Sequence, residues 1–294
     1  MPRVAVVTDS CASIPEPMLE ELNIHWVPYY IHREDEILRD LVTIQRDDFY
    51  RWLTTAAKLP QTASPGPGDY LELYKRLVQE QGFREIISIH MTSRGSGAYQ
   101  AAIAAQKLAQ EILPEIKIEV IDTLNVAMSQ GWMAIEAARA ALCGKSLPEI
   151  VQLVRDMIPV TRMIQTADTL KYLYMGGRIG QAKRLLGSLL NIKPLIGMQE
   201  GVIVALGTAR SRRSAYKRMV ELVETTVDRM GQIKVAYMHA AALEEAQKIK
   251  EMVEERITVV ESLIAELSPA LGVHSGPGTA GLAFFPVNAS NPPP

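Results

Sequence analysis

The sequence predicts an α/β protein of two domains, the first of them built on a parallel sheet. Apolar runs at residues 3–7 and 24–31 are typical of strands, and residues 14–22 between them are typical of a helix. Strands joined through a helix favour parallel pairing, because the connection returns the chain to the edge where it started. After Pro159 the pattern changes to short strands, two of them joined by turn residues 199–201, which indicates a second domain with a mixed sheet.

The composition limits both the class of protein and the class of ligand. Of 294 residues, 48% are apolar and only 6% are aromatic, which suits an aliphatic core. The formal net charge of -2 argues against nucleic acid as a partner, since phosphate binding needs a basic surface. No stretch approaches the roughly 20 apolar residues of a membrane span, so no stable membrane insertion is expected. Two cysteines without C-x-x-C spacing favour a reducing, cytoplasmic location.

We expect the domains to span residues 1–158 and 159–286. Residues 287–294 are expected to form a disordered tail, because their Asn, Ser and Pro side chains offer little to bury. The first domain is predicted to have further strands at 85–91 and 117–121, a helix capped by Asp69, and helices at 41–53, 98–112, 126–142 and 147–157. The second is predicted to have strands at 162–167, 192–198, 202–206, 234–239, 257–264 and 282–285, and helices at 185–190, 210–229 and 243–254.

Three polar side chains lie in segments shaped by glycine and proline. Thr62 lies in residues 59–68, where prolines and glycines oppose regular structure, and Ser96 lies in a glycine-containing loop before an alanine-rich helix. His274 is followed by Ser275, Gly276 and a proline, which favours a loop. Hydroxyls and a histidine can together donate to a carboxylate. Each can instead have only a local role, the hydroxyls in turns or helix caps and the histidine in packing.

Other kinds of site find less support. The five histidines are scattered, without the spacing of a metal site, so no metal is indicated. Gly95-Ser96-Gly97 falls short of the G-x-S-x-G pattern of a serine hydrolase. Gly176-Gly177-Arg178 suits a tight turn before a helix, with the arginine in a surface ion pair. The basic cluster suits either a solvated helix face or a docking surface, and it comprises Arg210, Arg212, Arg213, Lys217 and Arg218.

In combination these motifs resemble the DegV family of bacterial fatty-acid-binding proteins, over about residues 4–285. No single motif is specific, but the ordered set is. It comprises Thr8-Asp9-Ser10, Pro60-Gln61-Thr62 with Pro65, Gly95-Ser96-Gly97-Ala98-Tyr99-Gln100, Val120-Ile121-Asp122-Thr123, Leu173 with Gly176-Gly177-Arg178-Ile179, Leu186-Gly187-Ser188-Leu189-Leu190-Asn191-Ile192-Lys193-Pro194, and His274-Ser275-Gly276-Pro277-Gly278.

The resemblance implies a Rossmann-like N-terminal sheet with helices on both faces and a C-terminal α+β domain, with one long-chain fatty acid bound between them. It implies a carrier without catalysis or cofactor of its own. Such a carrier presents the acid to a fatty acid kinase, which makes acyl phosphate for phospholipid synthesis.

The resemblance also implies roles for particular residues. Thr62 and Ser96 would hydrogen-bond the carboxylate, with His274 beside it. Arg178 and Arg210 would match family arginines near the head group and on the kinase-facing surface. The loops that support the head group would contain Gly95, Gly97, Ser275 and Gly276.

The chain departs from the family pattern near this site. The family usually has T-S-Q-P where this chain has Thr62-Ala63-Ser64-Pro65, a leucine at the position of Gly95 and a threonine at that of Ala98. Two other functions stay open at this stage. One is an acyl- or phosphoryl-transfer enzyme with Ser96 as nucleophile and His274 as base. The other is a lipid-responsive interaction protein without a kinase partner.

Overall fold

The computed structural model describes residues 3–185, 192–227 and 231–287. The strands of the first half are β1 (Val4–Asp9), β2 (Ile24–Val27), β3 (Tyr30–Arg33), β4 (Glu36–Arg39), β5 (Gln61–Ala63), β6 (Glu85–His90) and β7 (Lys117–Asp122). Its helices are η1 (Ser10–Ala12), α1 (Glu16–Glu21), α2 (Arg46–Leu53), α3 (Pro67–Gln79), α4 (Ala98–Ile112), α5 (Met128–Leu142) and α6 (Leu147–Met157).

The second half also contains both strands and helices. Its strands are β8 (Arg162–Thr166), β9 (Lys193–Gln199), β10 (Val202–Ala209), β11 (Gln232–His239), β12 (Thr258–Glu266) and β13 (Ala280–Val287). Its helices are α7 (Lys171–Met175), η2 (Gly180–Leu185), α8 (Arg212–Thr226), α9 (Leu243–Glu254) and α10 (Pro269–Ser275).

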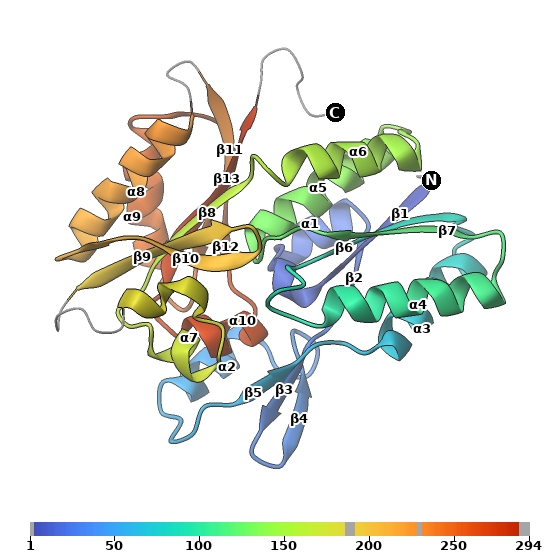
Figure 1. Ribbon diagram of the computed structural model, residues 1–294, viewed down its shortest axis with the longest axis horizontal. Helices are drawn as coiled ribbons and strands as arrows, with labels where there is room; N and C mark the ends of the chain where they lie inside the picture. The colour runs from blue at the N-terminus through green and yellow to red at the C-terminus, as the bar shows by residue number, and fades with distance from the viewer. Residues whose placement is uncertain (1–2, 186–191, 228–230, 288–294) are drawn as a thin grey trace.

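The N-terminal sheet is parallel, as predicted, in the order β2-β1-β6-β7. Every residue of its inner strand β1 is buried. Since successive side chains point to opposite sides, the strand is covered on both faces. Val4 and Val6 belong to the same apolar core as Trp132 of α5, whereas Ala5 and Val7 share a core with Tyr74 of α3. Helices α5 and α6 therefore cover one face, and α3 and α4 cover the other (Figure 1).

The C-terminal sheet is mixed, in the order β10-β9-β8-β13-β11-β12. Strands β11 and β12 are parallel, and the other neighbouring pairs are antiparallel. Helices α8 and α9 pack on one face, and the opposite face meets α5 of the first half. There Trp132 Nε1 donates to the Ala283 carbonyl oxygen (3.2 Å), and its ring contacts the edge of Phe285. One apolar core thus runs through both halves.

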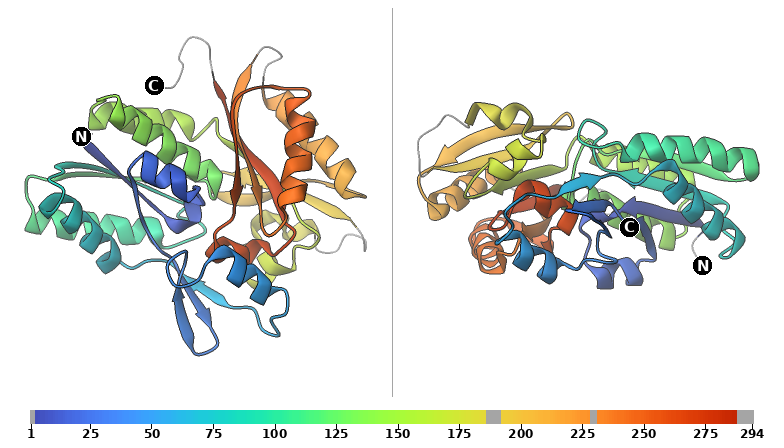
Figure 2. Two further views of the ribbon diagram at one scale, coloured as in Figure 1. Left: turned by 180° about the vertical axis from the view of Figure 1, so that it is seen from behind. Right: turned by 90° about the horizontal axis from the view of Figure 1, so that it is seen from below.

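A small sheet, β4-β3-β5, extends from the first half together with α2. Helix α10 (red), from the end of the chain, lies beside α2 and this sheet (blue), as Figures 1 and 2 show. The backbone nitrogen of Ser268 donates to Ser13 Oγ (3.0 Å), and that of Ala270 donates to Asp40 Oδ1 (3.1 Å). The N-terminal half therefore holds the start of α10 in place.

Two predictions of irregular structure are wrong, and both concern site residues. Thr62 lies in β5, which pairs with β3, because the prolines flank residues 61–63 instead of interrupting them. His274 lies in the last turn of α10, which begins with Ser268 as cap and Pro269 in its first turn. Gly272 inside this helix serves close packing, since a Cβ there would lie 2.8 Å from the rings of α2 residues Phe49 and Tyr50.

Several predicted boundaries also need correction. The expected strand at residues 24–31 is divided into β2 and β3, with Pro28 between them. The helix expected from residue 41 begins only at Arg46. The sequence predicts Asp69 as the N-cap of α3, but Gly66 occupies that position. The Asp69 carboxylate instead accepts a hydrogen bond from the Gly66 nitrogen (2.7 Å), from the third position of the helix.

Three other expectations are not tested by the described residues. The helix expected at 185–190 lies outside them apart from Leu185, and so do residues 288–294 of the expected tail, whereas Val287 ends β13. The domain limits 1–158 and 159–286 stay a prediction. Across the described part of the chain, no helix is long and apolar enough to cross a membrane.

A buried ionic cluster joins α5 to the C-terminal sheet. Lys234 Nζ of β11 lies 2.8 Å from Glu136 Oε1 of α5 and 3.0 Å from Glu261 Oε2 of β12. Arg139, one turn after Glu136, contacts both carboxylates, at 2.8 and 2.6 Å. Glu136 is fully buried, so its charge depends on these cations for compensation.

We predict that Lys234→Met lowers the free energy of unfolding by about 3 kcal/mol, because Glu136 loses one of its cations inside the protein. Urea denaturation of the variant and of the unmodified chain measures the difference. Lys248→Met is the matched control, since Lys248 pairs with Glu245 on the exposed surface of α9 and its loss should hardly change stability. Equal effects of both substitutions would contradict this account of the cluster.

Candidate functional site

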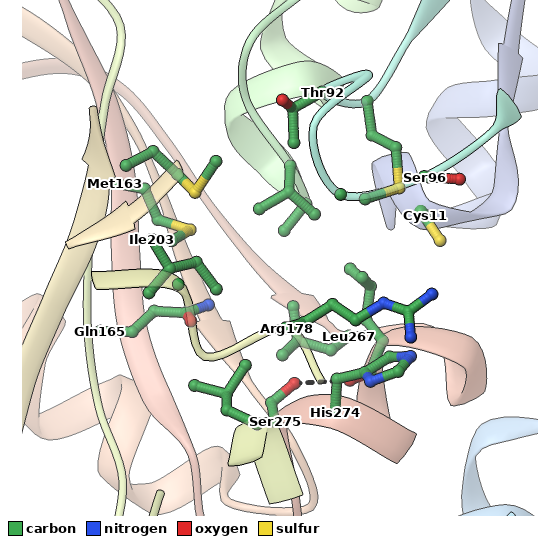
Figure 3. Close-up of a pocket in the computed structure, with 18 of the residues that line it drawn as sticks. Cys11, Thr92, Ser96, Met163, Gln165, Arg178, Ile203, Leu267, His274 and Ser275 are labelled. Atoms are coloured by element: carbon green, nitrogen blue, oxygen red, sulfur yellow. Dashed lines mark hydrogen bonds between the residues drawn. The ribbon is translucent and has the colours of Figure 1, made fainter. Parts of the chain in front are cut away.

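A cavity of about 240 Å³ lies between the two halves of the protein (Figure 3). Much of its wall is apolar and comes from both halves, namely Met91, Val126, Met163, Ile196, Met198, Ile203, Leu267 and Leu271. Figure 3 shows Ser96, Arg178 and His274 on one side of the cavity and Met163 with Ile203 on the other. The cavity therefore has a polar side and an aliphatic side.

The structure brings most of the predicted site residues together. Thr62, Ser96 and His274, which come from β5, the loop before α4, and α10, all line this cavity. Further predicted residues in the wall are Arg178, Gly95, Gly97 and Ser275. Arg210 and Gly276 are not part of the wall: Arg210 is exposed between β10 and α8, and Gly276 lies against another side chain.

Thr62 and His274 form a hydrogen-bonded pair across the two halves, with Thr62 Oγ1 2.7 Å from His274 Nε2. Burial, and then the nearby Arg178 guanidinium, lower the pKa of His274 to about 4, so the ring is neutral at pH 7. Its Nδ1 atom is buried and has no hydrogen-bond partner among the described residues. If the neutral ring carries its proton on Nε2, it donates to Thr62, and the Thr62 hydroxyl proton is available to a ligand. If the proton is on Nδ1, Thr62 donates to Nε2, and the Nδ1–H group has no acceptor.

Ser96 has a comparable arrangement at the start of α4. Its Oγ atom lies 2.6 Å from the Tyr29 hydroxyl and accepts a hydrogen bond from the Ala98 nitrogen (3.2 Å). Burial raises the pKa of Tyr29 well above its ordinary value, so the phenol keeps its proton. When that phenol donates to Ser96, the serine proton is free to be donated to a ligand. The polar side of the cavity thus has unused hydrogen-bond donors from both halves.

Positive charge lies at the edge of this polar side. Among the described residues of the wall, the side chains with a permanent charge are those of Arg94 and Arg178, both exposed. Arg178 donates to the Gly176 carbonyl oxygen (2.7 Å), and Figure 3 shows its guanidinium beside the His274 ring. An anion held by the neutral donors would lie within reach of this cation's field.

Two glycines permit the close approach of aromatic rings near the site. A Cβ on Gly176 would lie 2.2 Å from His274 Nδ1, so only glycine leaves room for the imidazole. A Cβ on Gly276 would lie 2.1 Å from the ring of Tyr172, and its backbone φ of 75° also favours glycine. These glycines, which looked like turn residues in the sequence, hold α7 and α10 together.

The sequence did not single out several residues of the wall. Tyr29 lies between two strands, and nothing in the sequence links it to Ser96, which lies 67 positions later. Arg94 and Ser64 lie next to predicted site residues, so their proximity in the chain could have suggested them. Gln165 lies in the middle of a predicted strand, where only alternation could show which face it occupies.

The fold and the cavity define a class: a two-domain α/β protein with a mainly apolar cavity between its halves and neutral hydrogen-bond donors on one side of it. The chain belongs to the DegV family, whose pattern it matches over residues 3–287; the family is described as uncharacterised protein, DegV family.

Solved structures of this family have the same fold. The chain is similar to a Thermus thermophilus DegV family protein described for its fatty acid binding, with a TM-score of 0.90 and 27% identity, covering 97% of this chain and 100% of that one. It is similar to DegV of Bacillus subtilis, described as a fatty acid binding protein, with a TM-score of 0.84 and 30% identity, covering 97% of this chain and 99% of that one. It is also similar to a stearic acid-binding protein from Eubacterium ventriosum, with a TM-score of 0.88 and 26% identity, covering 97% of this chain and 98% of that one.

We predict that Gly176→Ala weakens ligand binding about tenfold, because the new methyl group displaces the His274 ring and costs the Thr62 hydrogen bond. The measurement is a titration with a fatty acid, because the Thermus thermophilus and Bacillus subtilis relatives are described as binding fatty acids. Gly68→Ala is the control, since a Cβ there meets nothing within 4 Å. If both variants bind like the unmodified protein, His274 does not depend on the space at Gly176.

Asp40, which holds the start of α10, is fully buried, and its Oδ2 atom has no hydrogen-bond partner among the described residues. Burial raises its pKa from 3.8 to about 6. At a pH between these two pKa values, the Asp40 carboxyl group has lost its proton in the unfolded chain but keeps it in the folded protein. The contribution of Asp40 to stability therefore falls as the pH rises through this range, by about 3 kcal/mol in all.

Asp40→Asn should remove this pH dependence, because an amide does not ionise and can still accept from Ala270. We expect the variant to gain stability relative to the unmodified protein as the pH rises from about 4 to 7, by up to about 3 kcal/mol. Denaturant unfolding of both proteins at the two pH values measures this. A stability difference that stays constant with pH would show that Asp40 is not the responsible group.

Proposed function

We propose that the protein binds one long-chain fatty acid in the cavity between its halves and presents the carboxylate to a fatty acid kinase. The observation that carries the proposal is the cavity itself, with an aliphatic wall and a polar side where Thr62, Ser96 and His274 converge. The fatty acid binding of the Thermus thermophilus and Bacillus subtilis relatives supports it.

The aliphatic wall suits the acyl chain. Each buried methylene contributes about 0.8 kcal/mol, so a long chain reaches high affinity without any cofactor. The methionines at positions 91, 163 and 198 add flexible side chains that adapt to the shape of a chain. We expect no cofactor other than the bound acid.

The polar side suits the carboxylate. An anion without hydrogen-bond partners would be very costly in such a place. The hydroxyls of Thr62 and Ser96 have protons to donate to it when His274 Nε2 and the Tyr29 phenol are the donors within their own pairs. Because His274 is neutral, the compensating positive charge comes from Arg178 at the edge.

We propose that a separate kinase transfers the phosphate and that this chain is a carrier without catalysis of its own. The exposed Arg178 and Arg210 suit contact with such a partner or with the phosphate that it transfers. Acyl phosphate made in this way would feed phospholipid synthesis, and we place the protein in the cytoplasm. An enzyme using Ser96 with His274 as base finds less support, since no hydrogen bond joins these two residues in the described chain and His274 Nε2 is engaged by Thr62.

Native mass spectrometry of the purified protein tests the proposal, followed by extraction and identification of bound material. We expect a mass excess equal to one long-chain fatty acid. A protein that is empty and that also takes up neither added palmitate nor added oleate would overturn the carrier function. A purified fatty acid kinase with ATP then tests the partner separately, by following acyl phosphate formation in the presence and absence of the loaded protein.

Ser96→Ala tests the place of the carboxylate within the same experiment. We expect about tenfold weaker fatty acid binding with the fold intact, since one donor to the anion is lost. Ser93→Ala is the matched control, because Ser93 lies in the same loop but outside the cavity wall. Similar affinities of the two variants would place the carboxylate elsewhere.

A further inference from the structure

A carboxamide lies in the cavity wall away from the polar side. Gln165 of β8 is only 7% exposed, and it lines the cavity together with Met163 and Ile196. Figure 3 shows its side chain on the opposite side of the cavity from Ser96, with the amide end directed into the open space. A buried polar group among aliphatic side chains requires a partner or carries a cost.

The strand register explains why Gln165 points this way. Met163 and Gln165 are two positions apart on β8 and therefore share a face. In the neighbouring strand β13, Gly281 lies directly opposite Gln165. A Cβ on Gly281 would lie 2.7 Å from Gln165 Cγ, so the missing side chain leaves the space that the glutamine occupies.

No hydrogen bond to the Gln165 side chain is formed by any residue in the described ranges 3–185, 192–227 and 231–287. Its neighbour Thr166 also lines the cavity, but its Oγ1 atom forms no hydrogen bond with any described residue and so does not pair with the amide. The carboxamide offers two N–H donors and an acceptor oxygen. A plain methylene chain would leave all of them unpaired.

We propose that Gln165 selects long-chain acids that carry a hydroxyl on the interior of the chain. A hydroxyl both donates and accepts, which matches the two kinds of group on the carboxamide. Because Gln165 lies on the opposite side of the cavity from Ser96, this contact would fall along the acyl chain and away from the carboxylate (Figure 3). The inference rests on the proposed function, since it names the class of fatty acid that the same cavity prefers.

The test compares stearate with positional isomers of monohydroxystearate, by titration into the unmodified protein and into Gln165→Met. The unmodified protein should bind at least one hydroxylated isomer about tenfold more tightly than stearate, because that isomer pairs the buried amide. Methionine has nearly the same length without polar hydrogens, so Gln165→Met should lose this preference and bind stearate at least as well. Met163→Leu, a volume-conserving change on the same face, should keep the preference.

The inference is overturned if Gln165→Met keeps the preference, or if the unmodified protein binds stearate more tightly than every hydroxylated isomer. A gain of equal size for all acids in Gln165→Met would also overturn it, because the amide would then have held only water. Failure of the proposed function gives a different result, in which neither stearate nor any hydroxylated isomer binds to any of the proteins.

Discussion

The cavity depends on the docking of α10 against the N-terminal half. The two halves also meet through Trp132 with Phe285 and through Glu136 with Lys234, but α10 is the segment that places a C-terminal polar side chain, His274, beside Thr62 in the cavity wall. Its first turn is held by Ser13 and Asp40, and its last turn brings His274 to Thr62. The same burial that lets Asp40 hold the first turn of α10 raises the pKa of its carboxyl group to about 6.

Small residues shape the site as much as functional side chains do. Gly176 leaves room for the imidazole of His274, Gly272 lets α10 approach α2, and Gly281 leaves room for Gln165. In each case the glycine lies at a contact between segments that are distant in the sequence. The conformation of the polar side is therefore set by close packing and not by loop flexibility.

The chemistry of the polar side relies on neutral donors. Burial keeps His274 uncharged and Tyr29 protonated, so each hydrogen-bonded pair, Thr62 with His274 and Ser96 with Tyr29, has one proton more than its own hydrogen bond uses. Permanent charge stays at the exposed edge, where water limits its desolvation cost. An amphiphilic anion fits such a division, since its chain meets aliphatic side chains and its head group meets donors near solvent.

By itself the sequence determined the parallel N-terminal sheet, the hairpin of β9 and β10, and Thr62, Ser96 and His274 as site candidates. Alternation, turn residues and helix caps are local, so they can be read from neighbouring residues. Only the tertiary structure decided that Thr62 lies in a strand and His274 in a helix, that Tyr29 supports Ser96, and that Gln165 faces the cavity. These facts depend on contacts between residues far apart in the chain, and such contacts leave no local pattern.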